Sequence, residues 1–221
     1  MAKAFEMTRA IQQPGRTAAR ALAICVWLAL LCPLGCAVRT DPGRKAISEA
    51  NTPIARETFV DVAGVTHQPA QAGGAKANVL FFLLADCPVS NNYSPEINAI
   101  ARDYRERGVR CYIVQVDADI TAAEARKHAE EFHLSIPVVL DPQHRLVRFA
   151  KANIAPSAAI VLPGQTVAYC GRIDDRYAEL GKRRAAATKH DLRDALEAVL
   201  AGKPVAKPRT TPIGCYITPA H

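Results

Sequence analysis

The sequence lacks a second cysteine where a local pair of redox thiols would need one. Cys87 follows the apolar run "NVLFFLLA", but the residue three positions later is Ser90, which carries no sulfur. A serine cannot close a disulfide, so this stretch excludes a two-cysteine motif of closely spaced thiols. Cys87 therefore either acts alone or finds its partner thiol elsewhere in the chain.

Metal-ligand spacing is also missing. The six histidines show no regular spacing, either among themselves or relative to the cysteines, which excludes a structural zinc site. A copper site built from two cysteines four positions apart would need a thiol where Asn91 stands. We therefore expect no cofactor and no dedicated metal site, and only weak copper binding stays open.

The body of the chain has no basic surface signature. The formal net charge of +7 is concentrated at the two ends, because residues 1–40 hold five Lys/Arg against one acid and residues 181–221 hold eight against three. Nucleic-acid binding would require basic residues clustered with aromatic side chains on the folded domain. We expect no nucleic-acid partner, and interpret the basic C-terminal residues as a solvated surface.

Residues 1–38 are typical of a targeting segment. A basic stretch ends at Arg20, and residues 21–38 carry no charge, as in an export signal or an N-terminal membrane anchor. Three outcomes stay open, namely lipidation at Cys36, cleavage after Ala37 and retention as an anchor, with a buried core helix as the alternative. We expect the domain to work in the periplasm or elsewhere outside the cytoplasm, associated with the membrane through residues 21–38.

The rest of the chain is long enough for one domain with a core of its own. Polar residues with Pro and Gly predict a linker over 39–57, a domain over 58–202 and an extended tail over 203–221 that carries Cys215. Within the domain, apolar periodicity predicts a strand pair over 58–67, strands over 78–85, 110–119 and 136–141, a hairpin over 157–173, and helices over 88–106, 121–134 and 188–202.

Alternation of strands and helices predicts an α/β sheet covered by helices on both faces. Ligand chemistry in such sheets lies at the carboxyl ends of the strands, where Cys87 stands. A cysteine at a helix N-terminus meets backbone N–H groups that favour the thiolate, whereas the neighbouring carboxylate of Asp86 opposes it. The alternative is that Cys87 is a small buried side chain without reactivity.

Three segments carry a resemblance to a known family. They are "FFLLADCPVSNNYSPEI", "IAPSAAIVL" and "GRIDDRY", which together resemble the redoxin branch of the thioredoxin superfamily over about residues 57–202. The chain is most similar to exported peroxiredoxin-like (AhpC/TSA-like) proteins with a single CxxS-type active cysteine. The resemblance implies a thioredoxin-like fold, with a central mixed sheet flanked by helices, to which this chain adds an N-terminal strand pair and a C-terminal tail.

The resemblance also implies roles for individual residues. Pro156 would be the cis-proline that lies against the active cysteine, and Ser90, at the position of the second thioredoxin cysteine, would hydrogen-bond a Cys87 thiolate. Arg172 and Arg176 lie in a loop that the fold brings toward the active end, where an arginine would stabilise a thiolate or a sulfenate. An ordinary strand-entry proline, a polar helix residue and a surface turn are the alternatives.

Two cysteines are candidates for the partner of Cys87, and a third possibility is that it has none. We rank Cys215 first, because a tail can deliver a thiol across a long loop at modest entropic cost. Cys170, at the end of the predicted hairpin, ranks second, and the absence of any partner ranks third. Cys111 begins an apolar strand and is expected in the core.

These observations predict an exported thiol-disulfide oxidoreductase in which Cys87 is the nucleophile and Cys215 or an external thiol resolves the intermediate. Its partners would be a protein disulfide or thiol, or a peroxide, together with an external thiol reductant. Two alternatives stay open: a non-catalytic binding module of a membrane redox or metal-delivery complex, and a thiol peroxidase that acts through Cys87.

Overall fold

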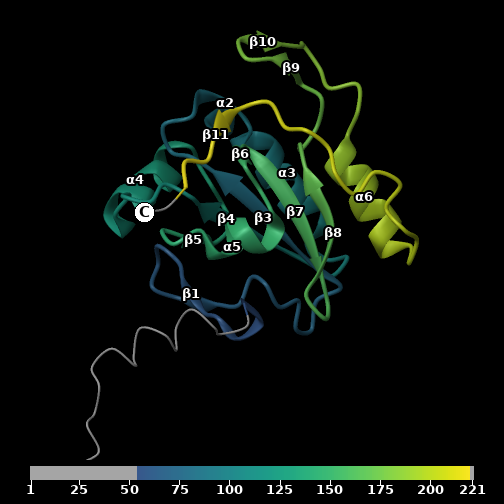
Figure 1. Ribbon diagram of the computed structural model, residues 1–221, viewed down its shortest axis with the longest axis horizontal. Coiled ribbons are helices and arrows are strands. Elements are labelled where there is room, and N and C mark those ends of the chain that lie inside the picture. The colour runs from purple at the N-terminus through teal and green to yellow at the C-terminus, as the bar shows by residue number, and fades with distance from the viewer. Residues whose placement is uncertain (1–53, 220–221) are drawn as a thin grey trace, which may run out of the picture. The chain divides into compact units, whose positions relative to one another are not determined.

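The computed structural model describes residues 54–219 (Figure 1). The predicted export signal or anchor over 1–38 and nearly all of the predicted linker lie outside the described residues. Between residues 54 and 219, no helix combines the length and the apolar character needed to cross a membrane.

A five-stranded mixed sheet forms the centre of the domain (Figure 1). Its strands lie in the order β5, β4, β3, β7 and β8. The pairs β3–β4 and β4–β5 are parallel. The pairs β3–β7 and β7–β8 are antiparallel. The strands are β3 (Ala77–Leu83), β4 (Val109–Gln115), β5 (Val138–Leu140), β7 (Ser157–Leu162) and β8 (Thr166–Gly171).

The central strand β3 is buried along its whole length, as its continuous apolar sequence predicts. Because side chains alternate across a strand, Val79 and Phe81 belong to one apolar cluster and Leu80 and Phe82 to the other. The sheet therefore separates two cores. The predicted α/β class, with a central mixed sheet flanked by helices, is confirmed.

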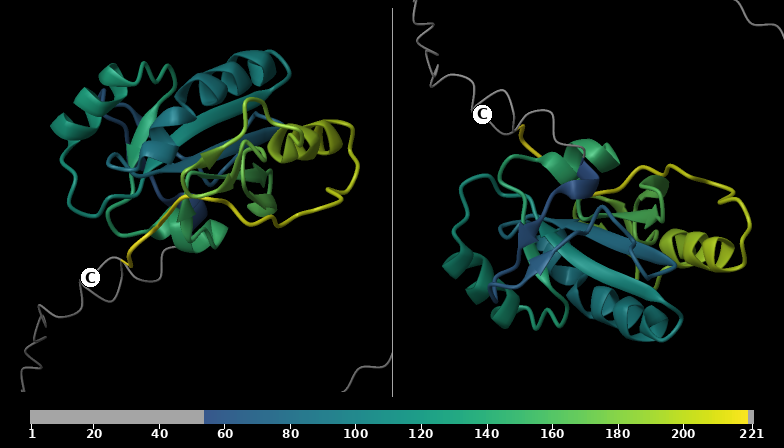
Figure 2. Two further views of the ribbon diagram at one scale, coloured as in Figure 1. Left: turned by 90° about the horizontal axis from the view of Figure 1, so that it is seen from above. Right: turned by 90° about the horizontal axis from the view of Figure 1, so that it is seen from below.

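Helices cover both faces of this sheet (Figure 2). The cluster that contains Phe81 takes in side chains of α3 (Ser94–Arg105), α4 (Ala122–Glu131) and α6 (Asp191–Leu200). The opposite cluster takes in α5 (Arg145–Ala150) and receives the short 3-10 helix η1 (Ile54–Arg56) at its margin. Helix α4 begins with a capping box, in which Thr121 and Glu124 satisfy each other's backbone N–H groups.

The single helix predicted over 88–106 is wrong, because the structure has two. α2 (Pro88–Asn92) ends at Tyr93 and α3 starts at Ser94. Pro95 has no N–H to donate to the carbonyl of Asn91, and its ring would crowd that carbonyl in a continuous helix. The Ser94 hydroxyl donates to Asn91 O instead, at 2.9 Å. The break separates the short helix α2, which has Cys87 at its N-terminus, from the longer helix α3, which packs in the core.

Both edges of the sheet are covered. The predicted strand pair joins β1 (Phe59–Val60) to β2 (Thr66–His67), and Val62, in the turn between them, donates its N–H to Val138 O of β5 at 2.9 Å. Such covering removes unpaired edge groups that would otherwise pair with other chains.

A second hairpin, β9 (Tyr177–Glu179) with β10 (Lys182–Arg183), was not predicted from the sequence.

The C-terminal tail is extended, as predicted, and it lies against the domain. Its residues 208–210 run along β8, where Cys170 N–H donates to Pro208 O at 3.0 Å. Further on, β11 (Cys215–Tyr216) pairs in antiparallel fashion with β6 (Ile154–Ala155) (Figure 1). We call residues 208–217 the docked tail. The boundaries proposed for linker, domain and tail stay predictions.

Candidate functional site

Cys87 is the N-cap residue of α2. Its backbone is extended (φ −90°, ψ 110°), and Pro88 occupies the first helical position, where a missing N–H costs no hydrogen bond. Cys87 N–H donates to Leu84 O at 3.2 Å, and Asn91 N–H donates to Cys87 O at 3.1 Å. The side chain is only 1% exposed. The Cys87 sulfur is thus held at the N-terminus of α2 and is buried.

The surroundings of the Cys87 sulfur favour the thiolate. Burial raises the pKa of Cys87, but hydrogen bonds from the Cys215 thiol, from the Ser90 backbone and hydroxyl, and from the Val89 backbone together hold that pKa below its ordinary value. Hydrogen bonds donated to the charged form of an acidic group favour its ionisation. Ser90 is fully buried, and its oxygen also accepts from Leu84 N–H at 3.5 Å.

Cys215 is the thiol next to Cys87. Burial, its hydrogen bond to Cys87 and the negative charge of Cys87 raise the pKa of Cys215 to about 11. Of the two thiols, Cys215 therefore keeps its proton while Cys87 ionises. The structure brings these two residues together although they lie far apart in the sequence.

The two other described cysteines have the properties of core residues. Burial raises the pKa of Cys111 to about 12 and also raises the pKa of Cys170. Cys170 belongs to the apolar cluster on the opposite side of the sheet from the cluster of Cys87. Of the four described cysteines, Cys87 is therefore the one whose surroundings most favour the thiolate, the nucleophilic form.

Pro156 follows a cis peptide bond, and this bond places the preceding carbonyl at the site. Ala155 O lies 3.6 Å from Cys87 Sγ. On the other side of this carbonyl, Gly214 of the docked tail packs so closely that a Cβ there would lie 2.0 Å from Ala155 O and 2.9 Å from Pro156 Cδ. Only glycine fits this position, and it lets the next residue, Cys215, reach the sulfur.

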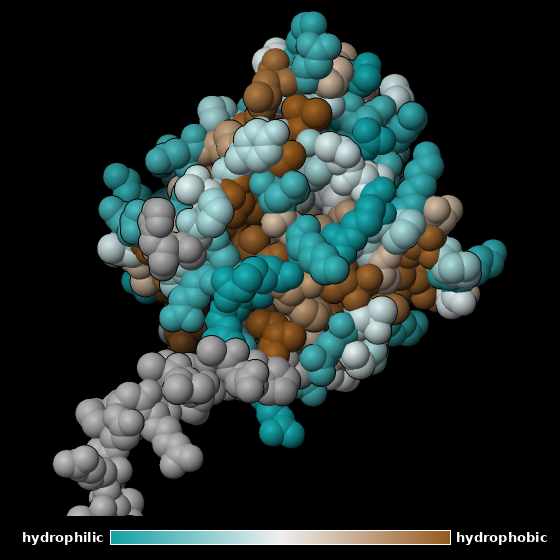
Figure 3. Space-filling view, viewed as in Figure 1, coloured by the Kyte–Doolittle hydropathy of each residue, from teal (hydrophilic) through white to brown (hydrophobic). Residues whose placement is uncertain are grey.

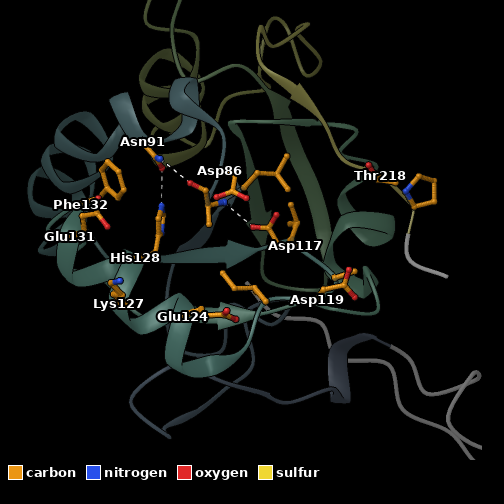
Figure 4. A pocket seen from close by; sticks show the side chains of 16 residues that line it. Asp86, Asn91, Asp117, Asp119, Glu124, Lys127, His128, Glu131, Phe132 and Thr218 are labelled. Atoms are coloured by element: carbon orange, nitrogen blue, oxygen red, sulfur yellow. Dashed lines mark hydrogen bonds between the residues drawn. The ribbon is translucent and has the colours of Figure 1, made fainter.

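A polar network holds the loop before Cys87 in place (Figure 4). Asn91 donates to Ala85 O at 2.9 Å, and Ala85 N–H donates to the Asp117 carboxylate at 2.8 Å. His128 Nε2 shares a 2.8 Å hydrogen bond with Asn91 Oδ1. The sequence alone did not identify Asn91, Asp117 and His128 as supporting residues. The polar "SNN" after Cys87 was the one local signal, and it did not identify their partners.

The same residues line a pocket of about 850 Å³ beside the site (Figure 4). Thr218 and Pro219, just beyond the docked tail, form part of its wall. Five carboxylates line it against one ammonium group: Asp86, Asp117, Asp119, Glu124 and Glu131 against Lys127. A substrate that approaches Cys87 from this side meets a negatively charged wall.

Arg172 and Arg176 are engaged with carboxylates. Arg172 pairs with Asp191 at 2.7 Å, and Arg176 lies 3.3 Å from Asp174 and 3.6 Å from Glu96. Within the described part of the chain, neither guanidinium has a hydrogen bond with the Cys87 sulfur. The structure therefore groups Cys87, Ser90, Pro156 and Cys215, and it pairs the two arginines with carboxylates. A role for either arginine in stabilising a thiolate stays a prediction.

Replacing Ser90 with alanine is expected to raise the pKa of Cys87, because the thiolate loses a hydrogen-bond donor while its burial is unchanged. The alkylation rate of Cys87 rises with pH as the thiol ionises, so the midpoint of that rise should move to higher pH in Ser90→Ala. The measurement is the pH profile of alkylation, read by mass spectrometry of the Cys87 peptide, with ultraviolet absorbance of the thiolate as a second readout.

Ser94→Ala is the matched control for this prediction. The Ser94 hydroxyl donates to Asn91 O, is part of the same pair of helices and does not contact the sulfur. An equal shift of the pH profile in both variants would mean that Ser90 acts by holding the helices rather than by bonding the thiolate.

The model of the AhpC/TSA family matches residues 48–170. No curated protein matches the chain.

Solved structures share the fold. A hypothetical protein from Sinorhizobium meliloti 1021 has 23% identity and a TM-score of 0.64 over 75% of this chain and 92% of its own. An uncharacterized conserved protein from Geobacillus kaustophilus has 24% identity and a TM-score of 0.61 over 73% and 87%. A candidate thiol:disulfide interchange protein, DsbE, from Chlorobium tepidum has 19% identity and a TM-score of 0.51 over 65% and 92%. At these identities the likeness shows a thioredoxin-like fold.

Proposed function

The chain belongs to the AhpC/TSA family of thioredoxin-like redoxins, and we propose that it is a thiol-disulfide oxidoreductase with Cys87 as nucleophile and Cys215 as resolving thiol. One observation carries the proposal: a buried cysteine at a helix N-terminus, with a lowered pKa, receives a hydrogen bond from a second thiol delivered by the docked tail. Two thiols in hydrogen-bond contact are ready to form a disulfide after little movement.

In the first step, the Cys87 thiolate attacks one sulfur of a substrate disulfide. A bond forms between Cys87 and that sulfur, the substrate S–S bond breaks, and the other substrate sulfur leaves as a thiolate that takes up a proton. The lowered pKa of Cys87 increases the fraction of this cysteine that is thiolate, which is the form that attacks a disulfide.

In the second step, Cys215 attacks the Cys87 sulfur of this mixed disulfide. A Cys87–Cys215 disulfide forms, the bond to the substrate breaks, and the substrate leaves with both of its sulfurs reduced. Cys87 carries no negative charge in the mixed disulfide, so the charge that contributes to the raised pKa of Cys215 is gone. Cys215 thus ionises more easily after the first step than before it. An external thiol reductant then returns both cysteines to thiols.

A thiol peroxidase that acts through Cys87 is the alternative with the same nucleophile. Attack on a peroxide releases an oxyanion, which a positively charged or donating group must stabilise. The pairing of Arg172 with Asp191 and of Arg176 with Asp174 and Glu96 leaves both guanidinium groups occupied. These contacts favour the disulfide substrate over the peroxide. A non-catalytic binding module would not need the lowered pKa of Cys87.

Location and membrane association follow from the N-terminal sequence and are part of the proposal. A charge-free segment after a basic one supports export to the periplasm, with residues 21–38 as signal or anchor. Periplasmic conditions are oxidising, which suits a protein that cycles between dithiol and disulfide.

Mild oxidation is expected to link Cys87 to Cys215 within one chain. After trypsin digestion without reductant, mass spectrometry should find the Cys87 and Cys215 peptides joined and the Cys111 and Cys170 peptides free, because burial keeps the last two as thiols.

Cys215→Ser is the control for this peptide map. In that variant Cys87 should appear as a sulfenate, as an adduct of an external thiol or as a disulfide between two chains. A Cys87–Cys170 linkage in the unaltered chain, or an unmodified Cys87 beside an oxidised Cys111, would contradict the assignment of Cys215.

A further inference from the structure

The docked tail occupies the space that a substrate must enter. Cys87 is 1% exposed, and the residue that meets its sulfur from outside is Cys215. Cys215 is paired with Ala155, whose carbonyl lies 3.6 Å from Cys87 Sγ. A substrate sulfur must approach the Cys87 sulfur, and the Cys215 thiol already lies beside that sulfur as a hydrogen-bond partner. Both sulfurs cannot occupy this place at once.

A first anchor holds the tail at β8, away from this sulfur. Arg209 donates to Ala150 O at 2.7 Å. The Thr210 hydroxyl shares a 2.7 Å hydrogen bond with the Tyr169 hydroxyl and accepts from Arg172 N–H at 3.0 Å. Thr210 also lies so close to Gly171 that a Cβ there would be 2.1 Å from the Thr210 hydroxyl. This anchor is made of several mutually supporting contacts.

The second anchor, at β6, is short. It consists of the two-residue pairing of β11 with β6, of Ile217 N–H, which donates to Asn153 O at 3.0 Å, and of the Ile217 side chain, which packs at the margin of the apolar cluster that contains Leu80 and Phe82. Tyr216, one of the two residues of β11, is 77% exposed, so its side chain contributes little packing to this anchor. Two-residue pairings at the surface belong to the parts of a fold that open most easily. The segment over Cys87 can therefore lift while residues 208–210 stay in place.

The surface around the tail indicates what kind of partner fits. Figure 3 shows the face along which the tail runs in Figure 1, and hydrophilic and apolar side chains are interleaved there without one continuous apolar patch. The tail itself is held at β6 by backbone hydrogen bonds. A partner that uses the same place needs an extended backbone to pair with Ile154 and Ala155 and a sulfur at the position of Cys215.

We propose that residues 211–217 are an internal stand-in for the substrate, and that an extended cysteine-containing polypeptide displaces them from Ile154–Ala155 to reach Cys87. The anchor at β8 keeps the displaced tail nearby, so Cys215 returns to attack the mixed disulfide after the substrate is bound covalently. The proposal rests on the proposed function, because displacement matters only where Cys87 is a nucleophile. It assigns the substrate class as unfolded or flexible polypeptide disulfides.

Kinetics of the full chain test this competition. In a Cys215→Ser background, reduced Cys87 is mixed with a short unstructured peptide whose cysteine is joined by a disulfide to thionitrobenzoate, and release of the coloured thiolate is followed. Attack joins Cys87 to the peptide sulfur and breaks its bond to thionitrobenzoate. Gly214→Ala, whose Cβ collides with Ala155 O, should raise the second-order rate constant by about tenfold or more, as expected when a closed state gives way to an open one.

Thr210→Val is the second variant, which weakens the distant anchor by removing two hydrogen bonds and leaves the surroundings of Cys87 unchanged. It should also raise the rate constant for the peptide. Two matched controls should leave it unchanged. Gly73→Ala adds a methyl group whose nearest neighbour is 3.9 Å away, and Thr166→Val alters an exposed threonine at the start of β8.

Reaction with the small disulfide dithionitrobenzoate distinguishes failure of the proposed function from failure of the displacement proposal. If Cys87 releases no thionitrobenzoate from either reagent in any variant, the proposed function is wrong and this inference with it. A different result overturns the displacement alone. In that case Cys87 reacts with the small disulfide and amide hydrogen exchange shows that Ile217 is loosened in Gly214→Ala and Thr210→Val, but the rate constant for the peptide does not change in either variant. Reaction with the small disulfide but none with the peptide in any variant would assign small thiols as substrates and overturn it too.

Discussion

Cys87→Ser is expected to lower disulfide reductase turnover by about a thousandfold or more, as removal of a nucleophile does in other enzymes that use covalent catalysis. A serine hydroxyl does not ionise at this site at neutral pH, and an oxygen cannot form the mixed disulfide. The measurement is reduction of a protein disulfide such as that of insulin, with dithiothreitol as reductant, followed against a blank without protein.

Cys111→Ala is the control for Cys87→Ser. It removes another buried thiol from the same apolar cluster, and the pKa of that thiol, about 12, keeps it protonated. Turnover in Cys111→Ala should stay within about twofold of the unaltered chain when the variant is folded, since it removes no nucleophile. Equal turnover of Cys87→Ser and the unaltered chain would leave the binding-module alternative standing.

Loss of the Cys215 sulfur is expected to have the second largest effect. Cys215→Ser should lower multiple turnover by about a hundredfold at low concentrations of external thiol, because a tethered thiol acts at a high effective concentration that an external one does not match. The mixed disulfide between Cys87 and the substrate should accumulate and be visible on a non-reducing gel. A first turnover without any such intermediate would contradict the resolving role.

Cys215→Ala separates the two actions proposed for this residue, which are first to donate a hydrogen bond to the Cys87 thiolate and second to resolve the mixed disulfide. A serine hydroxyl still donates a hydrogen bond to the Cys87 thiolate, whereas alanine does not, so the pKa of Cys87 should rise in Cys215→Ala and change less in Cys215→Ser. Both variants lack the resolving sulfur and should accumulate mixed disulfide alike. The pH profile of alkylation reads the first action and the gel reads the second. Equal pH profiles for the two variants would mean that the donor at residue 215 does not stabilise the thiolate.

Several parts of the fold follow from local sequence. The apolar run before Cys87 needed cover on both faces, and β3 is fully buried with Phe81 and Phe82 in different cores. Thr121 and Glu124 determine where α4 begins, because a capping box involves residues only three positions apart. The comparisons confirm the thioredoxin-like redoxin family that the resemblance indicated. Each of these features depends on neighbours within a few residues or on a pattern repeated along one element.

The site depended on contacts that no local pattern contains. From the sequence, Cys215 ranked ahead of Cys170 and of the absence of any partner thiol, and Arg172 and Arg176 were expected toward the active end. The structure places Cys215 beside Cys87 because Gly214 lets the tail lie against Ala155, and it pairs the arginines with carboxylates. The supporting pair of Asn91 and His128 also joins separate elements.

The sequence by itself therefore determined the α/β order of the elements, the placement of Cys87 before a helix and the absence of a local second thiol. The tertiary structure decided which distant thiol meets that cysteine and what covers it. The physical reason is that helix capping and strand burial are encoded over a few residues, whereas the docked tail is held by strand pairing and close packing across the chain.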